Sequence, residues 1–161
     1  PEDRKNEGLF PSMSIAFNMT LKVLSQFIGK LHVNAGKEKG IVKTYFERLQ
    51  VKAPGPETVI SSLSGGNQQK VSIGSWLAAD PKVLILDEST RGIDVGSKSE
   101  IYAKMNELAQ QGMSILMVSS ELPEILNMSD RVVVMSEGRI TATLDHTEAT
   151  QEKIMQNAVS I

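Results

Sequence analysis

The chain has 161 residues, of which 40% are hydrophobic and 22% charged, which is enough for one globular domain with a core. A formal net charge of -2 provides no basic field, so no nucleic-acid partner is expected. The absence of cysteine excludes disulfides and thiolate metal sites, and only His32 and His146 are available for a histidine site. No apolar run approaches the roughly 20 residues that a bilayer-spanning helix needs.

The first third of the chain predicts two amphipathic helices. Over residues 12–30 the apolar residues follow a helical period, at Ile15, Met19, Val23 and Phe27. The same pattern predicts a second helix over residues 37–49. Residues 54–56, with the sequence PGP, then stop any helix.

Residues 63–70, with the sequence LSGGNQQK, place a serine and two glycines before a helix predicted over residues 67–79. Such a segment presents free backbone N–H groups and a hydroxyl at a helix N-terminus, where the macrodipole favours an anion. The glycines allow the backbone to approach a phosphate closely. Trp76, in the same helix, is predicted to be a packing residue.

Residues 83–88, with the sequence VLILDE, form a short apolar run that ends in two carboxylates. A run without alternation predicts a strand buried on both faces of a parallel sheet. Asp87 and Glu88 then emerge at the carboxyl edge of the sheet, where ligands bind. One carboxylate can hold Mg²⁺ beside a phosphate, and the next can orient or deprotonate a water, which indicates phosphoryl chemistry.

The rest of the chain predicts alternating helices and strands. Residues 97–100 match a capping box, so a helix is predicted over residues 98–111. The elements predicted after it are a buried strand at 115–118, a short helix at 121–127, hairpin strands at 131–136 and 139–144, and a terminal helix at 150–159. Helix, strand and helix in succession indicate a parallel sheet.

Three segments together resemble the ATP-binding cassette (ABC) ATPases. Residues 63–66 resemble the signature motif, residues 83–88 the Walker B strand, and residues 89–94 the D-loop. The resemblance implies an α/β fold, a partial P-loop NTPase domain. It has a helical subdomain at about 12–80, which includes the signature helix, and at 81–161 a mostly parallel sheet with flanking helices and a C-terminal β-hairpin.

A phosphate loop, which the family calls Walker A, is missing. No Gly-x-x-x-x-Gly-Lys-Ser/Thr pattern occurs in the chain. We therefore interpret the chain as the C-terminal part of a longer protein, and we expect it by itself to bind and hydrolyse ATP poorly.

The family mechanism places each ATP between the phosphate loop of one cassette and the signature of the other. Residues implied to contact the partner's ATP lie in and after the signature: Ser64, Gly65, Gly66 and Gln68. For this cassette's own nucleotide, the resemblance implies that Glu88 activates water as the catalytic residue and that Asp87 holds Mg²⁺. Asp94 is implied at the interface between cassettes.

Two further nucleotide-binding positions depart from the family pattern. Glu2 stands where the Q-loop has a glutamine, and Ser120 stands where a histidine usually contacts the γ-phosphate. Serine carries no positive charge and cannot shuttle a proton near neutral pH, so catalysis at this cassette's own site is expected to be impaired. Ser89 in place of a proline and Asn67 in place of the signature glutamine are milder changes.

Combined with residues 90–96 (TRGIDVG) and 119–121 (SSE), the signature resembles the second cassette of tandem ATPases in importers of ribose, galactose and xylose. This implies ATP and Mg²⁺ as ligands, another cassette and membrane permease subunits as partners, and a peripheral place on the cytoplasmic face of the membrane. Two alternatives remain: a non-transport ABC ATPase, or a degenerate regulatory or dimerisation cassette.

Overall fold

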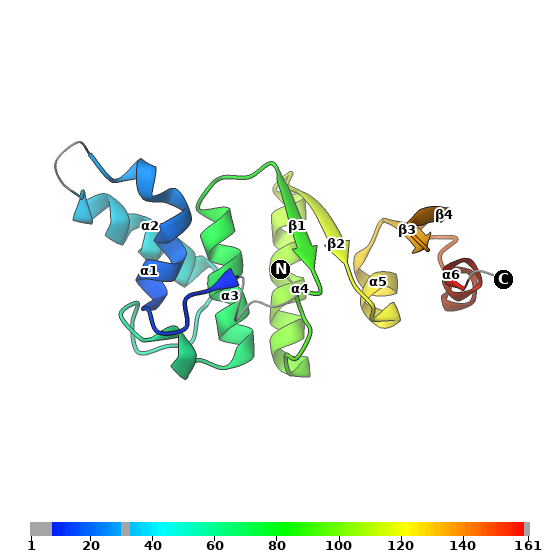
Figure 1. The fold of residues 1–161 in the computed structure, drawn as a ribbon, viewed down its shortest axis with the longest axis horizontal. Coiled ribbons are helices and arrows are strands. Elements are labelled where there is room, and N and C mark those ends of the chain that lie inside the picture. Colours follow the sequence, from blue (N-terminus) through cyan, green and yellow to red (C-terminus); the bar gives the residue numbers. More distant parts are fainter. Residues whose placement is uncertain (1–7, 30–32, 160–161) are drawn as a thin grey trace. The chain divides into compact units, whose positions relative to one another are not determined.

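The computed structural model describes residues 8–29 and 33–159. They form two compact units, the first ending at Val118 and the second beginning at Ser119. The first unit contains a group of helices followed by a parallel strand pair, and the second contains a hairpin with two helices (Figure 1).

The helical part of the first unit holds α1 (Ile15–Thr20), the 3₁₀ segment η2 (Leu21–Gln26), α2 (Ala35–Arg48), η3 (Ile60–Ser62) and α3 (Gly65–Leu77). The start of α1 is capped by Ser14, whose hydroxyl accepts from the Phe17 N–H. Asn34 caps α2 in the same way. Helix α1 packs against both α2 and α3, and α3 is buried along most of its length.

The single helix predicted over residues 12–30 is wrong. The α-helix ends at Thr20 and continues as η2, in which Val23 has non-helical angles of φ -122° and ψ 23°. The apolar face is nevertheless as predicted, because Val23 and Phe27 are each 3% exposed. A 3₁₀ helix repeats every three residues and η2 has only six, so over this length the apolar pattern alone does not separate the two helix types.

After α3 the chain forms β1 (Val83–Asp87), α4 (Val95–Gln110) and β2 (Ser114–Val118). The strands are parallel, with Val83 opposite Ser114 and Asp87 opposite Val118. Helix α4 packs against both β2 and α3. In Figure 1 it stands beside α3, so the start of α4 lies next to the signature segment.

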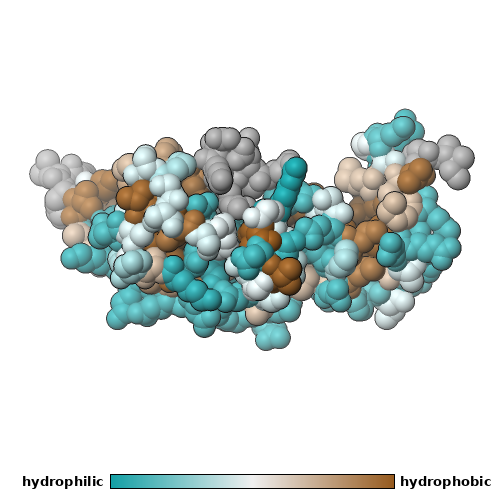
Figure 2. All heavy atoms as spheres, turned by 90° about the horizontal axis from the view of Figure 1, so that it is seen from below, coloured by the Kyte–Doolittle hydropathy of each residue, from teal (hydrophilic) through white to brown (hydrophobic). Residues whose placement is uncertain are grey.

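Strand β1 is not buried on both faces, contrary to the prediction. Leu84 and Leu86 are buried, but Ile85 is 63% exposed, and its partner Leu116 on β2 is 54% exposed. Paired residues share a face of the sheet, so one face of the strand pair is apolar and open. An unbroken apolar run shows that both faces are apolar, but it does not show that this chain covers both. Exposed apolar side chains also occur elsewhere in the described residues, and Figure 2 shows those on one face of the molecule in brown.

The start of α4 also differs from the prediction. Asp94, and not Ser97, is the N-cap: its carboxylate accepts from the Ser97 N–H at 2.9 Å. Glu100, predicted to reach back in a capping box, instead binds Lys52 and Lys70. The capping-box pattern was misleading because an equally good cap precedes it by one turn.

The second unit contains α5 (Leu122–Met128), β3 (Arg131–Ser136), β4 (Arg139–Asp145) and α6 (Gln151–Ala158). The predicted hairpin is confirmed as an antiparallel pair, and its turn residues Glu137 and Gly138 have φ of 48° and 77°. A small core joins the hairpin to the helices through Val132, Val134 and Ile154. In the described residues, the parallel pair β1–β2 and the predicted C-terminal hairpin β3–β4 form two separate two-stranded sheets.

Candidate nucleotide site

Ser64 lies at the N-cap of α3 and is exposed. Its hydroxyl does not cap the helix but accepts from the Asn67 amide nitrogen at 2.9 Å. The Asn67 amide oxygen accepts from the Lys52 backbone N–H at 2.8 Å, which fixes which end of the amide faces Ser64. The hydroxyl proton of Ser64 is thereby left to donate to an acceptor such as a phosphate oxygen.

Gly66 has a packing role that sequence reasoning missed. A Cβ built on it would overlap the Ser97 side chain and lie 3.5 Å from Ile93 Cγ2. The residue is buried where α3 meets the start of α4. Its lack of a side chain therefore permits the close approach of two helices, whatever it permits toward a ligand.

Gln68 and Trp76, two other residues of α3, differ in how far they are exposed. Gln68 is buried, and its amide nitrogen donates to the Ile60 and Leu63 carbonyls at 3.3 and 3.1 Å, so this side chain holds the turn before the signature. Trp76 is not a buried packing residue: it is 47% exposed, with the Lys22 ammonium 4.6 Å from the ring centroid.

Asp87 and Glu88 emerge at the carboxyl end of β1, as predicted. The Glu88 N–H donates to the Val118 carbonyl at 2.9 Å, which continues the strand pairing by one bond. Glu88 also has φ of 45°, in the left-handed region that non-glycine residues rarely adopt. Such a conformation at a candidate catalytic residue is a recurrent feature of active sites.

Asp94 is exposed at the start of α4. The backbone and side-chain hydrogen bonds from Ser97 hold the pKa of its carboxyl below the usual value. The carboxylate therefore stays ionised while it caps the helix. Ile93, beside it, is buried next to Gly66, so residues 89–94 and 63–66, which resemble the D-loop and the signature, are adjacent.

Asp87 suits Mg²⁺ as a single exposed carboxylate. Among the described residues no group of three or more His, Asp or Glu side chains could hold a metal ion. Mg²⁺ is usually bound through one or two carboxylates together with water and substrate phosphates, so one carboxylate at a strand end fits that ion when a nucleotide supplies the rest.

An ion-pair cluster beside the signature was also missed. Lys70 is buried, and its ammonium contacts Glu100 Oε2 at 2.5 Å and the Gln50 carbonyl at 3.2 Å. Lys52 reaches the other oxygen of Glu100 at 2.7 Å. Lys52 and Lys70 together lower the pKa of Glu100 to about 2. A lysine at the end of the LSGGNQQK segment was the available signal, but its partner lies 30 residues away.

The remaining two predicted residues are not joined to this site by the structure. Ser120 is exposed and belongs to the second unit, whereas Asp87 and Glu88 belong to the first. Its neighbour Ser119 donates to the buried Glu124 carboxylate and accepts from the Glu121 N–H. Glu2 lies outside the described residues.

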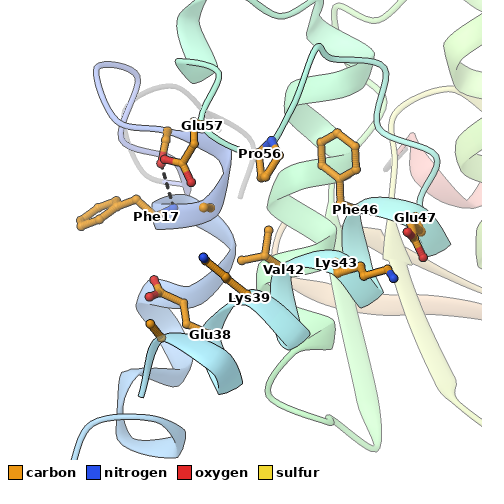
Figure 3. A pocket seen from close by; sticks show the side chains of 12 residues that line it. Phe17, Glu38, Lys39, Val42, Lys43, Phe46, Glu47, Pro56 and Glu57 are labelled. Carbon is orange, nitrogen blue, oxygen red and sulfur yellow. Dashed lines mark hydrogen bonds between the residues drawn. The ribbon is translucent and has the colours of Figure 1, made fainter. Parts of the chain in front are cut away.

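A cavity of about 610 Å³ lies between α1, α2 and the loop before α3. In Figure 3, Phe17 and Phe46 stand at its two ends with Val42 and Pro56 between them. Charged side chains surround this apolar floor: Glu38, Lys39, Lys43, Glu47 and Glu57. The cavity is separate from the signature segment.

The sequence profile of the family described as "ABC transporter" matches residues 3–91. The chain belongs to this family. Members with similar sequences include the ribose import ATP-binding protein RbsA of Geobacillus kaustophilus, 52% identical over 157 residues, which are 98% of this chain and 32% of that protein. The xylose import ATP-binding protein XylG of Histophilus somni is 51% identical over 160 residues, 99% of this chain and 32% of that protein. This ABC chain thus spans about a third of the length of these relatives.

The fold is that of an ABC cassette. The solved structure of MJ1267, an ATP-binding cassette of an ABC transporter, matches with a TM-score of 0.77 at 22% identity, covering 99% of this chain and 72% of that one. The predicted partial P-loop NTPase fold is confirmed. Within residues 8–29 and 33–159, no helix is both long and apolar enough to cross a membrane.

Proposed function

We propose that this chain is part of the ATP-hydrolysing subunit of an ABC importer for a simple sugar. Identity of 51 to 52% with ribose and xylose import ATP-binding proteins, extending over nearly the whole chain, carries this proposal. In that subunit, residues 12–80 form the helical subdomain and residues 81–161 the Walker B and D-loop part. The subunit works peripherally on the cytoplasmic face of the membrane.

The signature segment serves the ATP bound by another cassette. Ser64 is exposed, its hydroxyl proton is left to donate by the Asn67 contact, and the N–H groups of Gly65 and Gly66 belong to the first turn of α3. A hydroxyl donor and a helix N-terminus together favour the γ-phosphate. Gln68 supports the segment from inside, and Asp94 presents the start of α4 to the other cassette.

Asp87 and Glu88 serve this cassette's own nucleotide. Glu88 orients or deprotonates the attacking water, and Asp87 would hold Mg²⁺, which would neutralise charge at the phosphates. Glu2 and Ser120 stand at the sequence positions where the family usually has a glutamine and a histidine. Because serine cannot carry the positive charge of a histidine, this site hydrolyses ATP slowly, while the signature remains effective for the partner's ATP.

The permease binds the cavity between α1 and α2. Apolar side chains line the cavity and charged side chains surround it, which suits an amphipathic helix. Such a helix would bury its apolar face in the cavity and place its polar face beside the charged residues. Phe46→Glu should abolish co-purification of the permease while ATP binding by the subunit is kept. Retention of the permease by this variant would move the docking surface elsewhere.

Ser64→Arg in the complete transport ATPase tests the role of the signature. We expect ATP hydrolysis and sugar uptake to fall at least about tenfold, because one charge-assisted hydrogen bond is lost and the added bulk blocks the phosphate. Ser62→Arg, at an exposed position just outside the signature, is the matched control and should retain activity.

The same variant excludes one alternative, and the natural sequence excludes the other. A degenerate regulatory cassette would keep full hydrolysis in the Ser64→Arg variant. A non-transport ATPase would also lose hydrolysis in the Ser64→Arg variant. It differs from an importer in that its natural sequence would neither support sugar uptake nor bind a permease.

A further inference from the structure

Lys70 is a buried cation for which the proposed function has no use. It is only 3% exposed, and its ammonium is held between a carboxylate, Glu100, and a backbone carbonyl, that of Gln50. Burying a lysine is unfavourable unless it is paired and hydrogen-bonded, which these two contacts achieve. They come from α4 and from the segment that follows α2, so one side chain of α3 joins three parts of the first unit.

The ion pair is the second of two successive contacts between α3 and α4. The first is Gly66 against Ser97, and one turn further along each helix Lys70 meets Glu100. Ser64 and Asp94 are the N-caps of the same two helices. These two contacts between the helices therefore fix the position of Ser64 relative to Asp94.

We infer that Lys70 is a positioning residue, which with Glu100 locks α3 to α4 so that Ser64 and Asp94 meet the other cassette as one rigid body. This inference deepens the proposed function and rests on it for its catalytic consequence. The contact fixes the register of the two helices more than it adds stability, because Glu100 is 39% exposed and the pair is only partly buried, whereas an apolar pair of similar size has no fixed geometry. Gln50, whose carbonyl accepts from Lys70, lies just after α2, and α2 lines the cavity.

Lys52 provides a matched control. It binds the same carboxylate as Lys70, but its side chain is 71% exposed. Exposed ion pairs contribute little to stability. Lys52→Met should therefore leave the lock intact, whereas Lys70→Met with Glu100→Met replaces it by an apolar pair.

The first test measures position in the 161-residue chain without ATP. Because the chain has no cysteine, Ser62→Cys and Ser99→Cys can carry two spin labels, one next to the signature and one in the first turns of α4. We expect a narrow distance distribution in the parent and in Lys52→Met. The Lys70→Met/Glu100→Met pair should broaden or shift it at an unchanged unfolding midpoint. An unchanged distribution in that pair would overturn the inference.

The second test measures hydrolysis in the complete transport ATPase. The Lys70→Met/Glu100→Met pair should lower kcat about tenfold, while Lys52→Met should not, since a displaced hydrogen-bond donor no longer stabilises the phosphate. Glu100→Gln, which keeps an acceptor for Lys70, should lie between them. Full activity in the double variant would refute the lock if Ser64→Arg is inactive. Full activity in Ser64→Arg would refute the proposed function, and the label distances would still decide the lock.

Discussion

Gly66 occupies the closest approach between α3 and α4, so Gly66→Ala tests that contact. The added methyl would overlap Ser97, and we expect a loss of about 1 to 3 kcal/mol in the free energy of unfolding, typical of overpacking. Gly40→Ala is the control, because Gly40 lies inside α2 with nothing within 4 Å of the added Cβ. It should stabilise by about 0.5 to 1 kcal/mol. Urea unfolding of both variants measures this, and equal effects would contradict the contact.

Glu100 predicts a pH dependence. Lys52 and Lys70 lower its folded pKa from 4.5 to about 2, so the ionised carboxylate stabilises the folded chain above about pH 4.5, and this contribution is lost as the pH falls toward 2. Glu100→Gln should therefore be less stable than the parent near neutral pH, and the difference should shrink through this window. Urea midpoints at several pH values measure it. Lys52→Met should keep only part of the dependence, because it removes the hydrogen bond that lowers the pKa of Glu100 most and leaves the contact with Lys70. A pH-independent difference would exclude the ion pairs as its origin.

At the scale of single elements, the turn between β3 and β4 carries strain that can be relieved. Glu137 has φ of 48°, and a left-handed conformation costs a residue with a side chain about 1 to 2 kcal/mol. Asparagine tolerates it better, and Asn-Gly is the preferred pair for such turns. Glu137→Asn should raise the stability of the hairpin, whereas Glu137→Ala should not. Thermal unfolding and amide exchange in β3 and β4 measure the effect, and equal results for both variants would contradict it.

Which elements could be predicted depended on how local their cause is. The hairpin, α2 and the carboxylates at the end of β1 follow from turn residues, periodicity and strand order, all visible in short windows. The break at Val23 and the cap at Asp94 could not be predicted, because each is a choice between two locally acceptable conformations that packing decides. Among site residues, the position of Ser64 was predictable. The Lys70 to Glu100 pair was not, because its partners come together only when α3 and α4 pack.

At the scale of the whole chain, the open face of the parallel strands predicts self-association. Ile85 and Leu116 are 63% and 54% exposed on that face, and contiguous exposed apolar surface drives association. Ile85→Thr with Leu116→Thr should reduce the concentration-dependent mass measured by sedimentation. Val95→Thr removes an isolated exposed apolar side chain at the start of α4 and should have no effect. Association that persists in the double variant would place the contact elsewhere.

The distribution of nucleotide-binding groups along the chain predicts how it binds ATP. Segments that resemble a signature, a Walker B strand and a D-loop occur in the 161 residues, but the Gly-x-x-x-x-Gly-Lys-Ser/Thr pattern of a phosphate loop does not. Calorimetric titration of Mg-ATP into this chain should therefore detect no binding, whereas a longer protein that adds a phosphate loop upstream should bind. A micromolar Kd for the short chain, about -8 kcal/mol, would require its own residues to surround the triphosphate and would contradict a signature that acts only on another cassette's ATP.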